Sequence, residues 1–117
     1  MTIHEVLKEA LTGLAPKVGR HPLDERPDTY IAWFEVLATP VTASNQWIRV
    51  RHMMQVDIYS KQPLDELVAA VLYKLRRAGC RIVDWGPELY KSDTRYRHVP
   101  VTLYLVTEEE PIDKDDP

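Results

Sequence analysis

The sequence is poor in the features that support covalent, phosphate or metal chemistry. Its single cysteine, Cys80, excludes an intramolecular disulfide and a thiolate cluster, and predicts a small buried apolar side chain. Its four glycines are scattered, so no glycine-rich phosphate loop is present. No serine lies in a nucleophile elbow, and no two histidines have the four-residue spacing of a helical metal site. We therefore expect no enzymatic activity, no cofactor and no metal.

The chain also lacks a long apolar run and a strong basic excess. Residues 2–14 are amphipathic and too polar for a signal peptide or a membrane span, so we expect a protein made and kept in a cytoplasm. The net charge is −3. Residues 107–117 carry −5, from six acidic residues and one lysine, so residues 1–106 carry +2. Nucleic-acid-binding proteins usually present a basic face, so neither a specific nucleic acid nor a membrane is an expected partner.

The segment 47–60 has the strongest strand pattern in the sequence. Apolar side chains alternate with polar or charged ones, which is typical of a strand with one buried face. His52 interrupts the apolar series. The apolar face consists of Ile48, Val50, Met54, Val56 and Ile58. The opposite face consists of Trp47, Arg49, Arg51, Met53, Gln55, Asp57 and Tyr59.

The segment 64–78 predicts an amphipathic helix that is shorter than this strand. Its leucines and valines recur at helical spacing, and Gly79 suits the left-handed position that closes a helix. Fourteen strand residues span roughly 46 Å at ~3.3 Å each, whereas fifteen helical residues span roughly 22 Å. The helix can cover only about half of the apolar face. The remainder must bend, be covered by the first helix, or meet another subunit.

The first part of the chain predicts a helix and a long connection. Thr2 and Glu5 form a capping box for a helix over 3–13. Four residues that break regular structure, with charges between them, make 16–28 a connection that cannot sustain a helix or a central strand. The charges and two prolines of 107–117 predict a disordered acidic tail.

The expected strands are 29–38, 47–60, 81–85 and 96–106. The first two form a long hairpin, and both faces of the first are apolar, so its inward face stays open. A turn over 88–93 separates the last two, and Pro100 suits an edge strand or a bulge. The element order is α-β-β-α-β-β. It predicts one α+β domain over 1–106, with an antiparallel or mixed four-stranded sheet and two helices packed on one face.

The polar side chains offer a candidate interface. Arginine, aromatic residues and methionine are enriched at protein interfaces, and they gather on the outer face of 47–60. The alternative is a face covered within the monomer or simply solvated. His52 is interpreted as a hydrogen-bonded, partly buried histidine, and His98, beside two arginines, as structural or interfacial. The candidate interface residues are Trp47, Arg49, Arg51, Met53, Tyr59 and His98.

The second half of the chain carries several family motifs. The segments are Leu64-Asp65-Glu66-Leu67, Arg76-Arg77-Ala78-Gly79-Cys80, Gly86-Pro87-Glu88-Leu89-Tyr90, and Asp93 followed by Tyr96-Arg97-His98 before a final alternating strand. Over roughly 55–106 the chain resembles the tail-completion proteins of long-tailed bacteriophages, also called tail terminators or head–tail joining proteins. It departs from them at Arg97, because members often have tyrosine directly before histidine. These motifs follow the order of helices and strands in the family, and they do not form a catalytic signature.

The resemblance implies a non-enzymatic ring protein, usually a hexamer, that assembles in the cytoplasm of a bacterial host and resides in the virion tail. Such a ring caps the tail tube and joins it to the head connector, so the implied partners are further copies, the tail tube protein and the head connector proteins. Two other readings remain open. One is a regulatory module that binds a small ligand or peptide on the same sheet. The other is a small enzyme with a site at His52 or His98.

Overall fold

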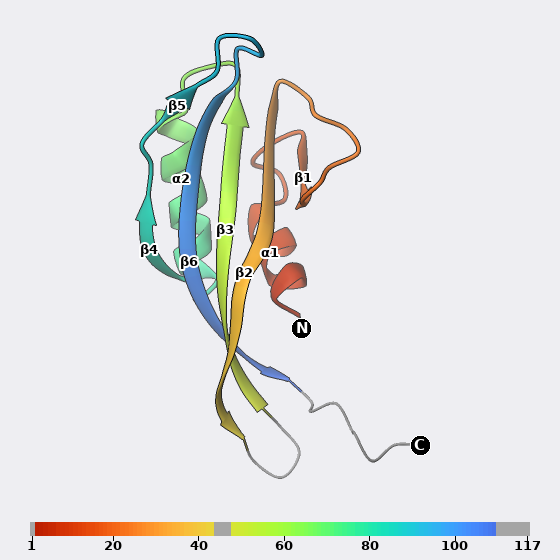
Figure 1. The fold of residues 1–117 in the computed structure, drawn as a ribbon, viewed down its shortest axis with the longest axis vertical. Helices are drawn as coiled ribbons and strands as arrows, with labels where there is room; N and C mark the ends of the chain where they lie inside the picture. The colour runs from red at the N-terminus through yellow and green to blue at the C-terminus, as the bar shows by residue number, and fades with distance from the viewer. Residues whose placement is uncertain (1, 44–47, 110–117) are drawn as a thin grey trace.

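The computed structural model describes residues 2–43 and 48–109 of the 117-residue chain (Figure 1). Within these residues the structure has two helices, each followed by three strands, which is the predicted α+β class. The elements are α1 (Ile3–Leu11), β1 (Lys17–Arg20), β2 (Thr29–Ala43), β3 (Ile48–Ser60), α2 (Asp65–Arg77), β4 (Arg81–Trp85), β5 (Leu89–Tyr90) and β6 (Arg97–Glu109).

The sheet is mixed and has six strands, so the predicted number of four is wrong. Its order is β1-β2-β3-β6-β4, and β5 pairs with β6. Strand β1 runs parallel to β2, while the other pairs are antiparallel. The two added strands lie in the predicted connection 16–28 and the predicted turn 88–93. They have four and two residues, which is too short for a period-two pattern to show in the sequence.

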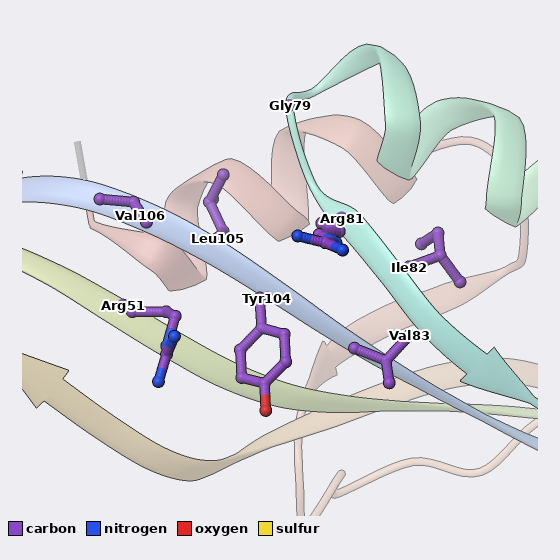
Figure 2. Close-up of a pocket in the computed structure, with 8 residues that line it drawn as sticks. All are labelled: Arg51, Gly79, Arg81, Ile82, Val83, Tyr104, Leu105 and Val106. Carbon is purple, nitrogen blue, oxygen red and sulfur yellow. The ribbon is translucent and has the colours of Figure 1, made fainter.

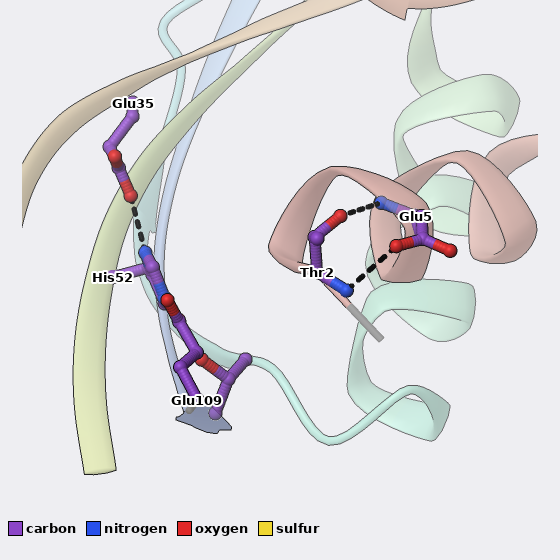
Figure 3. Close-up of polar contacts among 6 residues, drawn as sticks. Thr2, Glu5, Glu35, His52 and Glu109 are labelled. Atoms are coloured by element: carbon purple, nitrogen blue, oxygen red, sulfur yellow. Dashed lines mark hydrogen bonds and ion pairs between the residues drawn. The ribbon is translucent and has the colours of Figure 1, made fainter. Parts of the chain in front are cut away.

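Both helices pack on the same face of the sheet, as predicted. Helix α1 begins at the expected capping box, in which Thr2 and Glu5 each accept the other's backbone N–H (Figure 3). In β2 the inward residues are Ile31 and Trp33, which settles the face that the sequence left open. The core between the two layers consists mainly of Ile3, Leu7, Leu11, Ile31, Trp33, Met54, Val56, Ile58, Val71, Leu75, Val99, Val101 and Leu103.

The second helix matches its predicted span to within one residue at each end. Its closing residue, Gly79, has a positive φ of 93°, the left-handed conformation that glycine adopts without a steric penalty. The backbone N–H of Cys80 then donates to the carbonyl of Leu75 at 3.0 Å. Cys80 is buried, as expected, and burial raises the pKa of its thiol to about 11.

Strand β6 contains Pro100 although it is an interior strand. The prediction of an edge strand or a bulge holds only locally, because β4 pairs with β6 no further than Val101 and β5 begins opposite His98. The carbonyl of Pro100 accepts the N–H of Gly86 at 3.0 Å. Proline is tolerated here because the neighbouring ladder is interrupted at its position.

Three strands extend beyond the helices, as the predicted difference in length requires. We call this part the distal arm: residues 35–43 of β2, 48–53 of β3 and 105–109 of β6. In Figure 1 it continues past the ends of both helices. Strand β6 pairs with β3 as far as Glu109 opposite Ile48, so residues 107–109 belong to the sheet and not to a tail. The rest of the predicted tail, 110–117, lies outside the described residues.

Candidate functional site

The sheet face opposite the helices is covered at one end by aromatic side chains. Tyr30, Tyr59 and His98 are register partners across β2, β3 and β6. Their rings stack, with centroids 4.5 Å apart between the tyrosines and 4.4 Å apart between Tyr59 and His98. Tyr96 packs edge-on against both tyrosines, and its hydroxyl donates to the carbonyl of Pro27 at 2.8 Å. This end of the open face is therefore closed by the chain's own loops.

A buried carboxylate lies beneath these rings. Asp57 is 3% exposed and accepts hydrogen bonds from Nε2 of His21 at 2.9 Å and from Nε2 of His98 at 2.9 Å. The amide of Gln55 donates to it at 2.8 Å. Burial works to raise the pKa of Asp57, but the hydrogen bonds, led by that of His98, outweigh it and lower the pKa. Asp57 is thus a charged carboxylate with its hydrogen bonds satisfied, and it joins β3 to β6 and to His21, the residue that follows β1.

The other end of the open face belongs to the distal arm and is bare. Leu37, the register partner of Met53, is 57% exposed. Arg49 and Arg51 are also exposed, and Met53 is half-buried. Trp47, the remaining candidate of this group, lies outside the described residues. The predicted outer face of β3 therefore divides into an exposed part around the arginines and a part at Tyr59 that His98 of β6 covers.

A hollow beside the arm lies along β6 at the point where β4 begins. It has a volume of about 620 Å³ and takes its charge from Arg51 of β3 and Arg81 of β4. Figure 2 shows Arg51 and Tyr104 pointing to the same side of the sheet, while Leu105 points to the other. We call this hollow the arginine groove. Its lining consists of Arg51, Gly79, Arg81, Ile82, Val83, Tyr104, Leu105 and Val106.

On the helix-side face, the arm is tied together by His52. This residue is 6% exposed. Its Nδ1 contacts the carboxylate of Glu35, and its Nε2 lies 2.6 Å from Glu109 and 3.0 Å from the hydroxyl of Thr107 (Figure 3). Because both ring nitrogens face carboxylates, the doubly protonated ring satisfies both contacts. We call this group the His52 clasp, and it confirms the interpretation of His52 as a buried, hydrogen-bonded histidine.

The clasp changes the titration of its members. Burial works to lower the pKa of His52, but the hydrogen bonds to Glu35 and Glu109 raise it, and the net shift is upward. The pKa of Glu109 is lowered, chiefly by the Thr107 hydroxyl and then by His52. The sequence offered one hint of this group, since Glu35 is a lone charge within an apolar strand. Neither Glu35 nor Asp57 was among the predicted site residues.

The histidine and acidic side chains of these groups contact one another. Among the residues that the structure describes, no three histidine, cysteine or acidic side chains are arranged to hold a metal ion. The ring nitrogens of His52 face Glu35 and Glu109, and Nε2 of His98 is occupied by Asp57. Within 2–43 and 48–109, no helix is long and apolar enough to span a membrane.

Comparison with known proteins places the fold. No protein-family model matches the sequence, and no curated protein matches it. Among solved structures, a chain in the virion of a native gene transfer agent particle is similar, with a TM-score of 0.50 and 11% identity. The match covers 89% of this chain and 85% of that chain. At this identity the likeness shows a shared fold.

Proposed function

We propose that the protein is a structural component of a phage or prophage tail, which forms a ring that caps the tail tube and joins it to the head connector. The observation that carries this proposal is the distal arm, which leaves the two-layer body and exposes apolar and arginine side chains. The family resemblance in residues 55–106 and the fold shared with a virion chain support it. The virion tail would be its location, after assembly in the cytoplasm of the host.

The composition of the arm suits a contact between proteins. Three of its side chains, Val36, Leu37 and Val41, are each about half exposed or more. Fully burying an aliphatic side chain of this size contributes about 1.5–3 kcal/mol. Arg49 and Arg51 lie on the same side of the sheet as Leu37, where guanidinium groups can set the register of a partner. An arm that a neighbour buries would gain stability that the isolated chain does not have.

The arm also suits closure of a ring. It projects from one end of an elongated molecule of 52 × 28 × 22 Å. A projecting arm contacts a different surface on its neighbour, and a heterologous contact of this kind closes into a ring when the rotation allows it. The resemblance suggests six copies. The tail tube protein and the head connector proteins would bind the two faces of such a ring.

Light scattering coupled to size exclusion, over a concentration series, tests the proposal. We expect a species near six times the 13.6 kDa chain mass at high concentration, and a ring in electron micrographs. Leu37→Asp should remove this species. Leu89→Asp is the matched control, because Leu89 is 50% exposed on β5, away from the arm. A wild-type chain that stays monomeric at every concentration, with and without tail tube protein, would overturn the proposal.

The alternative function is a small ligand- or peptide-binding module. The arginine groove favours it, because concave sites with a few convergent polar groups are typical of ligand sites. Such a module would remain a monomer or dimer in the same scattering experiment. We propose a non-enzymatic role in either case, since the buried histidines already have carboxylate partners.

A further inference from the structure

The arginine groove has a defined chemical preference. The guanidinium of Arg51 lies over the ring of Tyr104, with its central carbon 5.1 Å from the ring centroid. Arg81 is the register partner of Tyr104, and it lines the same hollow as Arg51 (Figure 2). Val83 and Val106 border the groove and are 48% and 39% exposed. Two cations beside an apolar wall favour an acidic segment that also carries an apolar side chain.

The two arginines have no acidic partner within the described part of the chain. Other cations there do pair: Arg97 contacts Glu88 at 3.0 Å, and Lys17 contacts Asp24 at 3.3 Å. Neither Arg51 nor Arg81 lies within ion-pair distance of a carboxylate in residues 2–43 and 48–109. Their charge is therefore available to a group from elsewhere.

We propose that the arginine groove binds the acidic segment 110–117 of a second copy of this chain. The inference rests on the proposed function, because it requires neighbouring copies. The segment holds four acidic residues and one lysine, a net charge of −3, and one large apolar residue, Ile112. Carboxylates can pair bidentately with guanidinium groups, and Ile112 can lie against Val83 and Val106. This chemistry complements each part of the groove.

The direction of β6 favours a second copy over the same copy. Glu109 lies five residues beyond Tyr104 along β6, which is roughly 17 Å at ~3.4 Å per residue. In Figure 1 the end of β6 points away from β4, the strand that carries Arg81. The chain's own segment would have to reverse and run back over the sheet to reach the groove. A neighbour's segment can enter without this reversal, and each copy would then bind the next.

A peptide titration tests the groove itself. A chain truncated after Glu109 would be titrated with a synthetic peptide of residues 110–117 and followed by nuclear magnetic resonance. We expect saturable shifts at the groove, and an affinity at least tenfold weaker in Arg51→Glu with Arg81→Glu. Arg76→Glu with Arg77→Glu is the matched control, because both arginines are exposed on α2. Equal affinity for both double variants would overturn the proposed site.

A mixing experiment tests the second copy. The truncated chain has a groove but no segment, and Arg51→Glu with Arg81→Glu has a segment but no groove. With Leu37→Asp added to both chains to remove the arm contact, we expect the two together to form a heterodimer by light scattering, and neither to do so alone. Circular dichroism would confirm that each variant is folded. Arg51→Gln with Arg81→Gln, which removes the charge without reversing it, would replace a groove variant that does not fold.

The outcomes separate this inference from the proposed ring. If the wild type forms its oligomer and truncation leaves that oligomer unchanged, the second-copy contact is overturned while the ring stands. If the peptide binds the truncated chain but the mixture gives no heterodimer, the segment binds its own chain and the inference is also overturned. If the wild type never oligomerises, the ring and the second-copy contact fail together.

Discussion

The two halves of the sheet are held together by opposite arrangements of charge. In the half that the helices cover, Asp57 accepts hydrogen bonds from two histidines, His21 and His98. In the distal arm, His52 lies between two carboxylates, Glu35 and Glu109. The first half also has a core of fully buried aliphatic and aromatic side chains, whereas the arm exposes such residues to solvent. We infer that apolar packing stabilises the body and that polar contacts such as the His52 clasp stabilise the arm.

The largest expected effect compares the same substitution in the two halves. Leu75→Ala removes a fully buried side chain from the core and should lower the free energy of unfolding by about 2–5 kcal/mol. Leu37→Ala, in the arm, should change it by less than about 0.5 kcal/mol in the monomer. Urea titration of both variants measures the difference. Similar values for the two leucines would show that the arm is packed in the free chain.

The second prediction concerns the Asp57 cluster. Asp57→Ala leaves two imidazoles and an amide without their acceptor, and we expect a loss of about 1–3 kcal/mol. Because the pKa of Asp57 is lowered in the folded chain, its stabilising effect is present above the unfolded value of 3.8 and is lost as pH falls through the folded pKa.

The acid limb of the stability curve provides the measurement. The wild type should lose more stability than Asp57→Ala as pH falls below about 4. Asp57→Asn is the control, since it keeps the shape of the side chain and removes the charge. If the free energy of unfolding falls equally in the wild type and in Asp57→Asn as the pH is lowered, the Asp57 carboxylate is not the cause of the acid sensitivity.

The third prediction concerns the His52 clasp, which should have the opposite pH dependence. The pKa of His52 is raised, so its contribution is fully present below the unfolded value of 6.5 and is lost as pH rises through the folded pKa. His4 lies near this group, and its own pKa is lowered by burial first and then by the charges of Arg20 and His52. His52→Gln should therefore lower the free energy of unfolding by about 1 kcal/mol at mildly acidic pH. At alkaline pH the difference from the wild type should be smaller.

Local protection of the arm shows whether this effect is confined to it. Amide hydrogen exchange in residues 48–53 should become faster as pH rises, beyond the intrinsic increase, in the wild type only. The covered part of β3 is the internal reference. An equal increase in exchange rate in the arm and in the covered part of β3 would show that the effect lies in the global stability and not in the arm.

The smallest expected effect on stability belongs to the arginines of the arm. Arg49→Glu with Arg51→Glu changes two exposed side chains and should alter the free energy of unfolding by less than about 0.5 kcal/mol. We expect the same variant to lose the oligomer in light scattering. The control variant, Arg76→Glu with Arg77→Glu on α2, should keep the oligomer. An oligomer that persists in the arm variant would remove these arginines from the subunit contact.

Much of the fold could be predicted because it depends on local periodicity. The two faces of β3, the span of α2 and its closing glycine follow from residues that are neighbours in the chain. The difference in length between β3 and α2 predicted that α2 leaves part of the sheet uncovered, and the distal arm belongs to that part. The absence of regular patterns in 16–28 and 88–93 concealed β1 and β5, since strands this short form only where a longer strand offers its edge.

The candidate site depended on register, which local patterns do not contain. Strict alternation would place Leu37 on the same face as Trp33 and Glu35. A bulge between Glu35 and Leu37 shifts the register, so Glu35 stays beside His52 while Leu37 moves to the open face. His52 and Glu109 are 57 residues apart, and His98 and Asp57 are 41 apart. The sequence determined which faces are apolar and where the charges lie along the chain. Only the pairing of β2, β3 and β6 decided which charges meet, because strand pairing brings together residues that no local interval connects.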